Sequence, residues 1–404
     1  MLNEMKSASG GKIALVQDYL KEYGGAEAVF ETLTDIFPDA DIYTTLYCPK
    51  FFGPHKERLE KKWGTRVHQS FFKYIPFAYK IISPLRLFSP LSFKLFNFSS
   101  YDLIITSATG AYFPNALNKK SAKLICYCHT PPRYLYGLPT ARNLKKYPVL
   151  NYLAQIANHF LRLLDYKYAH NVDQFIANSA TTAARIQKFY RRDSIIINPP
   201  IDLPKVVMKS GVFSAQRTRS AKREPEGSEH CKTLDECFYL TGGRLARAKR
   251  YDIAIKACNQ LKAPLKIFGR DFAGFADELK KIAGPTIEFL GEVTQEEKAK
   301  LFSDALAYLF CSDNEDFGMV SVEAQSYGCP VVGYKSGGII ETVIDGKTGI
   351  LFDQLTPDSC ANAIEKLNKL NLKSSDCIEN SQKFSTENFI QKIKSLVSPT
   401  HLSN

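Results

Sequence analysis

The sequence lacks the long apolar segments and the cysteine spacings that define several protein classes. It has no run of about 18 uncharged apolar residues, which argues against a membrane-spanning helix, and its N-terminus lacks the apolar core of a signal peptide. Its ten cysteines show no zinc-ligand spacing, and Cys126 and Cys128 lie inside an apolar run. We therefore expect a cytoplasmic protein with reduced, buried thiols and no structural metal.

The composition is that of a globular protein with an excess of positive charge. The 404 residues are 45% hydrophobic and 12% aromatic, and this length predicts two domains rather than one. The net charge of +12 indicates an anionic partner, which could be nucleic acid, an acidic membrane surface or a phosphate-rich small molecule. The charge could also serve only solubility.

Short apolar, β-rich runs alternate with helical stretches along the whole chain. This alternation predicts an α/β fold of two Rossmann-like domains with parallel sheets, the sheets facing each other across a cleft. Helix ends are marked by Asn178 and Ser179, by Thr294 with Glu297 as a capping box, and by Gly328. The predicted strands are residues 12–20, 41–47, 101–109, 123–130, 173–179 and 194–200, and then 237–245, 265–270, 287–293, 305–312, 329–334 and 349–352.

The domain boundaries follow from these runs. We expect an N-terminal Rossmann-like domain at 1–204, a C-terminal Rossmann-like domain at 237–382, and a final helix at 383–404 that packs back on the first domain. Residues 205–236 form a polar stretch with six basic and no acidic residues between 205 and 223. We interpret it as a flexible linker, whose charge could contact a membrane or nucleic acid or could simply be solvated.

A second unusual stretch, residues 71–98, holds seven Phe, four Lys or Arg, three Pro and no acidic residue. The prolines and charges argue against a spanning helix. Two interpretations stay open. The stretch could attach the protein peripherally to an anionic bilayer, or it could form helices that pack around the first sheet.

Two glycine turns that follow strands are candidate phosphate sites. Gly24 and Gly25 come after the first strand and before a helix, whose N-terminus offers free N–H groups and partial positive charge. In the second domain, Arg244 and Lys249 follow a Gly-Gly turn and can converge on one diphosphate. Neither turn is a GxGxxG motif, so no dinucleotide is inferred.

The stretch EDFGMVSVEAQSYGCPVV, residues 315–332, places Glu315 before a short helix and Glu323 within it. Phe317, Gly318 and Met319 would supply backbone N–H groups at the helix start. The two carboxylates are too far apart along the helix to form an acid–base pair. Their ability to accept hydrogen bonds from hydroxyl groups suggests a polyhydroxylated ligand such as a ribose or a hexose.

His129 ends the KLICYC strand, and Asp39 and Asp41 form an Asp-x-Asp motif. A histidine at the carboxyl end of a strand is either a structural residue or a contact to a sugar. The Asp-x-Asp motif precedes a strand instead of following one. We therefore interpret it as turn chemistry and expect no metal site.

These motifs together resemble the family 4 retaining glycosyltransferases of the GT-B fold, especially mannosyltransferases of surface-polysaccharide assembly. The resemblance rests on QDYLKEYGGAEAVFE, FPDADIYT, YDLIITSA, ICYCHTPPRY, VDQFIANSATTAARI, GGRLARAKRYDIAI, EDFGMVSVEAQSYGCPVVGY and GGIIETVIDGKTGILF. It covers nearly the whole chain except about the first ten residues and 205–236. The most specific part is the pair Glu315 and Glu323, eight residues apart with Phe317 and Gly318 between them.

The resemblance implies a role for each candidate. Arg244 and Lys249 would hold the donor diphosphate, Glu323 the ribose, and Glu315 with the backbone of Phe317, Gly318 and Met319 the transferred sugar. Gly24 and Gly25 would approach the phosphates from the first domain, and His129 would contact the sugar. As catalytic residues we expect Glu315, His129, Arg244 and Lys249.

The expected reaction is the retaining transfer of a hexose, mannose from GDP-mannose, to a glycan or polyprenyl-diphosphate-linked acceptor, without a metal or other cofactor. The resemblance has least support for recognition of the nucleotide base, because the turn at 268–274 reads FGRDFAG where the family usually has a glycine-rich turn. Rival readings are a nucleotide-sugar epimerase, a phosphorylase, or a basic protein that binds nucleic acid or lipid. The last of these leaves the paired glutamates without a role, so we expect no nucleic-acid partner.

Overall fold

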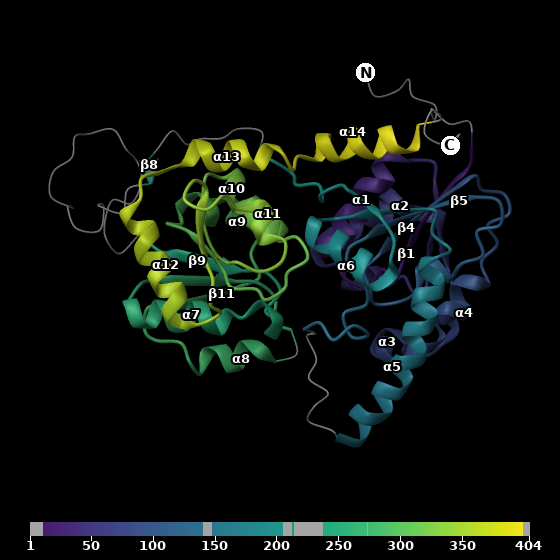
Figure 1. The fold of residues 1–404 in the computed structure, drawn as a ribbon, viewed down its shortest axis with the longest axis horizontal. Helices are drawn as coiled ribbons and strands as arrows, with labels where there is room; N and C mark the ends of the chain where they lie inside the picture. Colours follow the sequence, from purple (N-terminus) through teal and green to yellow (C-terminus); the bar gives the residue numbers. More distant parts are fainter. Residues whose placement is uncertain (1–10, 140–147, 205–211, 214–236, 273, 399–404) are drawn as a thin grey trace. The chain divides into compact units, whose positions relative to one another are not determined.

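The computed structural model describes residues 11–139, 148–204, 212–213, 237–272 and 274–398, and the chain divides into two compact units. The first unit comprises residues 1–200 with 386–404, and the second comprises 201–385 (Figure 1). Helix α14 (Thr386–Val397), near the C-terminus, thus belongs to the first unit, where Phe389, Ile393 and Val397 join a core cluster with Phe30 and Leu33 of α1. No described helix is long and apolar enough to cross a membrane.

The first unit is built on a seven-stranded sheet in the order β3-β2-β1-β4-β5-β6-β7, with every neighbouring pair parallel. Six of its strands were predicted. The edge strand β3 was missed, because its three residues lie outside any apolar run. The strands are β1 (Ile13–Gln17), β2 (Asp41–Thr44), β3 (Val67–Gln69), β4 (Leu103–Ala108), β5 (Lys123–Cys128), β6 (Gln174–Ala177) and β7 (Ser194–Ile196).

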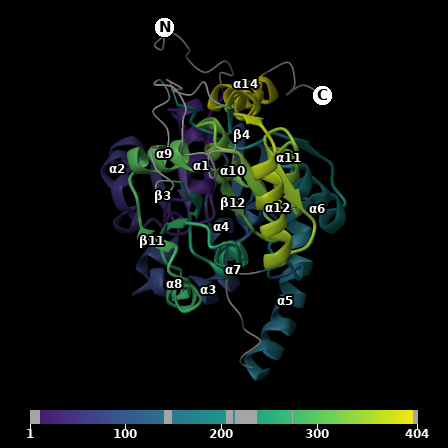
Figure 2. The ribbon, with the colours of Figure 1, turned by 90° about the vertical axis from the view of Figure 1, so that its left-hand side faces the viewer.

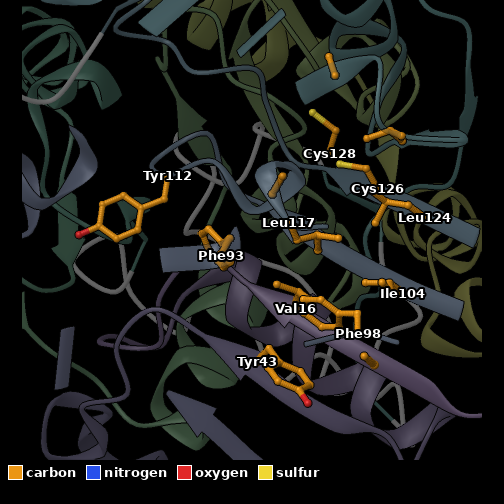
Figure 3. Close-up of a cluster of buried hydrophobic side chains, with 14 of the residues drawn as sticks. Val16, Tyr43, Phe93, Phe98, Ile104, Tyr112, Leu117, Leu124, Cys126 and Cys128 are labelled. Atoms are coloured by element: carbon orange, nitrogen blue, oxygen red, sulfur yellow. The ribbon is translucent and has the colours of Figure 1, made fainter. Parts of the chain in front are cut away.

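Apolar side chains cover both faces of this sheet. On β5, Leu124, Cys126 and Cys128 enter the cluster on one face, whereas Ile125 and Tyr127 enter the cluster on the other (Figure 3). This double burial is the reason that the strands read as continuous apolar runs. The helices are α1 (Gly25–Ile36), α2 (Lys56–Trp63), α3 (Ile82–Leu85), α4 (Ser89–Lys94), α5 (Pro148–Ala169), α6 (Ala180–Tyr190) and α14.

The second unit repeats this design with a six-stranded parallel sheet in the order β11-β10-β9-β12-β13-β14. All six strands were predicted. The strands are β9 (Tyr239–Gly242), β10 (Leu265–Phe268), β11 (Ile287–Gly291), β12 (Tyr308–Phe310), β13 (Val331–Tyr334) and β14 (Gly349–Phe352).

Helices flank this second sheet, and two of the expected helix signals are seen here. Thr294 and Glu297 form the reciprocal capping box of α9, and Gly328 follows the last turn of α10 with φ +76°. Helices α7 and α12 lie side by side in both views (Figures 1 and 2). The helices are α7 (Tyr251–Leu261), α8 (Phe275–Lys280), α9 (Gln295–Asp304), α10 (Met319–Ser326), α11 (Ile339–Thr342), α12 (Pro357–Lys369) and α13 (Ser374–Gln382).

Of the stretch at 205–236, only Val212–Phe213 lies within the described residues. These two residues form β8, which pairs antiparallel with β15 (Leu372–Lys373). The interpretation of the remainder as a linker therefore lies outside the described residues. All nine described cysteines are free thiols, and all of them except Cys48 are buried, as the sequence predicted.

Both sheets have the strand order of a doubly wound fold, in which ligands bind beyond the carboxyl ends of the strands where the order reverses. In the first sheet that position lies between β1 and β4, and in the second it lies between β9 and β12. The sites below are built from the loops that follow these strands.

Candidate active site

In the second unit, the loops after β9 and β12 meet beside the N-terminus of α10. Lys249 Nζ lies 2.6 Å from Glu315 Oε2, so the two loops are joined by an ion pair. Ser312 Oγ donates a second hydrogen bond, 2.6 Å long, to the same carboxylate oxygen. The backbone adds a further link, because the Asp313 amide donates to the carbonyl of Ala248 at 3.2 Å. The sequence-predicted residues Lys249 and Glu315 are therefore direct neighbours.

Arg244 belongs to the same edge of the sheet. Tyr251 Oη donates to the carbonyl of Gly242 at 3.0 Å and approaches the carbonyl of Arg244 at 3.3 Å. Burial is the main cause that raises the pKa of Tyr251, the charge of Glu315 raises it further, and the charge of Arg244 lowers it. Both charges thus act on one hydroxyl group, while the guanidinium of Arg244 itself lies over the ring of Phe272, 5.2 Å from its centroid.

Glu323 is linked to this region through Tyr308. Tyr308 Oη donates to the Gly242 carbonyl at 2.7 Å, and the charges of Glu323 and Glu315 both help to raise its pKa, after burial as the main cause. Glu323 itself pairs with Lys298 of α9 at 3.0 Å. The two glutamates therefore have different cationic partners, in agreement with the expectation that they do not form an acid–base pair.

The N-terminus of α10 is positioned by a close backbone contact. Gly318 caps the helix with φ +90°, and the amide of Gly338 donates to the carbonyl of Glu315 at 2.9 Å. A Cβ on Gly337, at φ +76°, would lie 2.2 Å from that carbonyl oxygen, so only glycine fits there. The side chain of Phe317 is buried against Phe384, and its backbone packs closely on Gly338, where a Cβ would lie 2.4 Å from the Cα of Phe317.

In the first unit, Gly24 precedes α1 and Gly25 is its first residue, close to the predicted start at 26. One feature of this helix start was not predicted. The Gly24 amide donates to Glu27 Oε2 at 3.0 Å, so a carboxylate of the same helix already holds one of the N–H groups that we expected to be free. Any anion that approached Gly24 would meet this negative charge.

His129 follows β5, as predicted, but its side chain is buried. Its Nε2 lies 2.9 Å from Ser107 Oγ of β4, and burial lowers the pKa of the imidazole to about 3. The residue is therefore neutral at ordinary pH and can act through hydrogen bonds but not as a cation.

Sequence reasoning missed Asp18, which follows β1. Its Oδ2 accepts hydrogen bonds from the amides of Thr109, Ala111 and Tyr112 and from the Thr109 hydroxyl group, so it fixes the loop after β4. Burial raises the pKa of Asp18 to about 6. The sequence feature that could have identified Asp18 is its position directly after a central strand. Lys298 and Ser312 were also missed, and no local motif marks either.

No metal cluster emerges from the residues that the structure describes. Within 11–139, 148–204, 212–213, 237–272 and 274–398, no group of three His, Cys, Asp or Glu side chains could hold an ion. Asp41 of the Asp-x-Asp motif accepts a hydrogen bond from Tyr101 Oη at 2.5 Å and pairs with Lys12 at 3.2 Å.

Comparison with known proteins identifies both halves of the chain. The family described as glycosyl transferases group 1 matches residues 223–384, and the family described as glycosyltransferase family 4 matches residues 23–205.

Among curated proteins, the chain is 22% identical to the alpha-1,3/1,6-mannosyltransferase ALG2 of Dictyostelium discoideum over 88% of this chain and 89% of that protein. It is 29% identical to a D-inositol 3-phosphate glycosyltransferase of a Nocardioides strain, over 48% of this chain and 46% of the relative. Several of these matches therefore span only about half the length of the relative.

Two solved structures share the fold. The Anabaena HepE protein in complex with UDP and glucose has a TM-score of 0.66 at 19% identity, covering 96% of this chain and 99% of that one. Sucrose-phosphate synthase of Thermosynechococcus elongatus has a TM-score of 0.68 at 18% identity, covering 97% and 100%. At this identity the likeness shows the fold alone. The two family matches and the two parallel-sheet units together show that the chain belongs to the family 4 glycosyltransferases of the GT-B fold.

Proposed function

We propose that the chain transfers mannose from GDP-mannose to a hydroxyl group of a glycan or a polyprenyl-diphosphate-linked glycan, with retention at the anomeric carbon. The observation that supports the proposal is the Lys249–Glu315 ion pair at the carboxyl ends of β9 and β12, with Arg244 in the same loop after β9 as Lys249. The likeness to ALG2, named as a mannosyltransferase, supports mannose as the sugar.

The leaving group determines the role of the cations. As the bond between the anomeric carbon and the phosphate oxygen breaks, negative charge develops on the diphosphate and positive charge on the sugar. Arg244 can bind two phosphate oxygens with its planar guanidinium group, and Lys249 can act as a compact charge. The N-terminal amides of α10 would add a third source of positive potential.

The carboxylates would bind the hydroxyl groups of the donor. We assign Glu315 to the transferred sugar and Glu323 to the ribose, because each can accept hydrogen bonds from hydroxyl groups. Lys298 would orient Glu323 through the 3.0 Å ion pair. From the first unit, we assign Gly24, Gly25 and the neutral His129 to the same reaction, His129 as a hydrogen-bonding group.

We assign no residue as a nucleophile, so the acceptor hydroxyl group attacks the sugar directly and its proton needs a recipient. The oxygen of the acceptor hydroxyl group forms the new bond on the face that the diphosphate leaves, and its proton passes to an oxygen of the departing diphosphate. Glu315 is less suited to attack the sugar, because its Oε2 already accepts from Lys249 and Ser312 at 2.6 Å each. We propose that no metal ion takes part, since Arg244 and Lys249 can neutralise the leaving group.

A different donor base is the second candidate. The HepE structures contain UDP or UDP-glucose, and the turn at 269–274 gives no motif that selects guanine over uracil. For the acceptor, we propose a lipid-linked glycan reached by peripheral contact with the inner face of the cytoplasmic membrane. The net charge of +12 and the apolar, basic stretch 71–98 support that contact.

The deciding experiment is a thermal-shift screen of GDP-mannose, UDP-glucose and ADP-glucose against the purified chain, with Arg244→Ala as the matched variant. A ligand at 100 times its Kd stabilises the folded state by about 2.7 kcal/mol. We expect GDP-mannose to raise the Tm of the wild type and to have a smaller effect on the variant. Stabilisation only by UDP-glucose would change the donor, and stabilisation by none of the three would contradict the proposed function.

Proton NMR of the donor without an acceptor separates transfer from epimerisation. A transferase leaves the configuration of the intact donor unchanged, whereas an epimerase converts the donor into an isomer. Conversion of the sugar while it stays attached to the nucleotide would replace the proposed reaction by the epimerase reading.

A further inference from the structure

Exposed apolar side chains are concentrated in two segments of the first unit. Of the 17 large hydrophobic residues that are exposed among the described residues, 13 lie in residues 74–95 or in α5. Those of the first segment are Tyr74, Phe77, Ile81, Leu87, Phe88, Leu91 and Leu95, and those of α5 are Tyr152, Ile156, Phe160, Leu163, Leu164 and Tyr166. Such a concentration is characteristic of an interaction surface.

The 71–98 stretch packs on the first sheet, as one of its two interpretations expected, and it also keeps exposed apolar residues. Phe72, Phe93 and Phe98 are fully buried in a core cluster, and these residues hold the segment on the first sheet. The seven exposed apolar residues lie in short turns and in α4. The buried phenylalanines therefore anchor a segment whose outer side stays apolar.

Helix α5 carries an apolar stripe on each side. At about 100° per residue, Tyr152, Ile156, Phe160, Leu163 and Leu164 fall within an arc of about 120°. Leu161 and Ala169 are buried and lie on the opposite side of the helix. The exposed stripe is thus additional to the one that packs on the core.

The two segments belong to one end of the unit. Lys94, the last residue of α4, places its Nζ 5.3 Å from the ring centroid of Tyr168 in α5. Arg86 stacks on the ring of Tyr134 at 3.7 Å, and Asn158 of α5 donates to the Tyr134 carbonyl at 3.4 Å. Figures 1 and 2 show α3 and α5 together, at the end of the first unit opposite α14.

The charge around this surface has a single sign. Residues 71–98 hold four Lys or Arg and no acidic residue, and α5 holds Arg162 and Lys167 with one acidic residue, Asp165. Lys73, Lys80 and Lys94 are exposed among the apolar residues of the first segment, and Lys167 is exposed on α5. The acidic residue of α5, Asp165, is buried and accepts a hydrogen bond from Tyr136 at 2.8 Å.

We propose that this apolar–basic face, formed by residues 71–98 and α5, docks on a membrane surface that contains anionic lipids. Exposed aromatic and aliphatic side chains would enter the boundary between head groups and acyl chains, while the lysines stay at the level of the phosphates. This gives the peripheral contact a defined surface. Its test needs neither donor nor acceptor, so it can fail separately from the proposed reaction.

Charge complementarity favours a membrane over two other occupants. A symmetric dimer through this face would place the lysines of one copy against those of the other, which is unfavourable. Nucleic acid would satisfy the lysines but would leave aliphatic side chains such as Leu87, Leu91 and Leu163 without a partner. An anionic bilayer satisfies both kinds of group at once.

The test is co-sedimentation of the full chain with vesicles of phosphatidylcholine alone or with about 30% phosphatidylglycerol, at about 0.15 M salt. The apolar variant is Phe77→Ser with Phe88→Ser and Leu95→Ser, and its matched control in the second unit is Ile340→Ser with Ile344→Ser. The charge variant is Lys73→Gln with Lys80→Gln and Lys94→Gln, and its matched control is Lys256→Gln with Lys280→Gln and Lys300→Gln. All these side chains are exposed, so the variants are expected to fold.

We expect the wild type and both controls to bind the anionic vesicles, and we expect each face variant to lose about tenfold or more in partition coefficient. Equal binding to both lipid mixtures, or no binding at all, would overturn the proposal. Mass measurements by analytical ultracentrifugation give a further check. Self-association that disappears in the apolar variant would assign this face to a second copy of the chain instead.

Discussion

The burial of His129 predicts a specific pH dependence for the stability of the first unit. Its imidazole pKa is lowered to about 3 by burial, whereas an unfolded histidine titrates near 6.5. Between these values the unfolded chain binds one proton more than the folded chain. The free energy of unfolding therefore falls as the pH is lowered through 6.5, and His129→Gln removes this loss.

The magnitude follows from the two pKa values. One bound proton corresponds to about 1.4 kcal/mol per pH unit, so lowering the pH from 6.5 to 5 costs about 2 kcal/mol in the wild type. Any folded-state pKa below about 4 gives nearly the same result above pH 5. Asp18, whose pKa burial raises to about 6, acts in the opposite direction, because its folded form gains a proton as the pH falls. Its contribution is shared by both proteins and cancels in their difference.

The assay can be confined to the unit that contains His129. The chain has one tryptophan, Trp63, which is fully buried in the first unit, so its fluorescence in urea reports the unfolding of that unit. Wild type and His129→Gln are compared at pH 7.5, 6.5 and 5. Exchange also removes the contact to Ser107, but that loss is the same at every pH and shifts the whole curve of the variant.

We expect the gap in stability between the two proteins to change by about 2 kcal/mol between pH 6.5 and 5, in favour of the variant. This corresponds to a relative shift of about 1 M in urea midpoint. The exposed His159 supplies the control, since His159→Gln should run parallel to the wild type. If the free energy of unfolding of His129→Gln followed the same pH dependence as that of the wild type, His129 would become protonated in the folded chain at pH 5. Its assignment as a neutral hydrogen-bonding group would then be refuted.

Three further predictions concern the second unit. Arg244→Ala and Glu315→Ala should each lower kcat at least about tenfold, equivalent to about 1.4 kcal/mol of transition-state stabilisation, and near-normal steady-state kinetics in both would remove the site assignment. A chelator such as EDTA should leave transfer by the purified protein unchanged, and loss of transfer would show that the cations Arg244 and Lys249 do not suffice. Gly337→Ala and Gly346→Ala form a matched pair, because the two glycines have nearly the same φ, +76° and +75°. They differ in the space around a new Cβ, which would lie 2.2 Å from the Glu315 carbonyl oxygen at Gly337 and would have nothing within 4 Å at Gly346. Denaturation should show a cost of about 1 to 2 kcal/mol for Gly346→Ala and a larger cost, with reduced turnover, for Gly337→Ala, and equal effects would contradict the close contact at Glu315.

The fold could be predicted largely because its strands are buried on both faces. Runs such as LIITSA at 103–108 and KLICYC at 123–128 stand out from their neighbours, and both are strands of the first sheet. The edge strand β3 gave no such signal. Its three residues, Val67, His68 and Gln69, pair with β2 through the backbone, and their side chains are partly or fully exposed. The strand therefore forms because of its pairing with β2 and not because its residues are apolar.

The candidate site could be predicted only as far as topology determines it. Parallel strands end at one edge, so residues after β9 and β12 were expected to be close, and Lys249 and Glu315 are. The partners that come from other elements could not be found this way. Lys298 reaches Glu323 from α9, and Gly338 reaches the Glu315 backbone from the loop after β13; neither contact leaves a pattern in the sequence.

One missed contact did leave a pattern. Gly24 and Glu27 have the spacing of a helix cap and the third residue of the helix, and such a glutamate turns back to the backbone amide of the cap. Recognising this spacing would have shown that α1 begins with its own carboxylate. The second unit differs in this respect, because the first turn of α10 has no acidic residue. The two helix starts thus differ, because the Gly24 amide is bonded to a carboxylate of the first turn of α1, whereas the first turn of α10 contains no carboxylate.

The hydrogen bonds of Glu315 also bear on the mechanism, because they affect whether Glu315 could attack the sugar. Oε2 of Glu315 accepts from both an ammonium and a hydroxyl group, and these two hydrogen bonds weaken that oxygen as a nucleophile. The same contacts hold Lys249 at the carboxyl edge of β9, where a cation is useful to a departing diphosphate. Under the proposed function, Glu315 would therefore position Lys249 and bind a sugar hydroxyl group and would not attack the sugar. In the proposed same-face mechanism the acceptor proton leaves with the phosphate, so that mechanism accounts for retention without a nucleophilic Glu315.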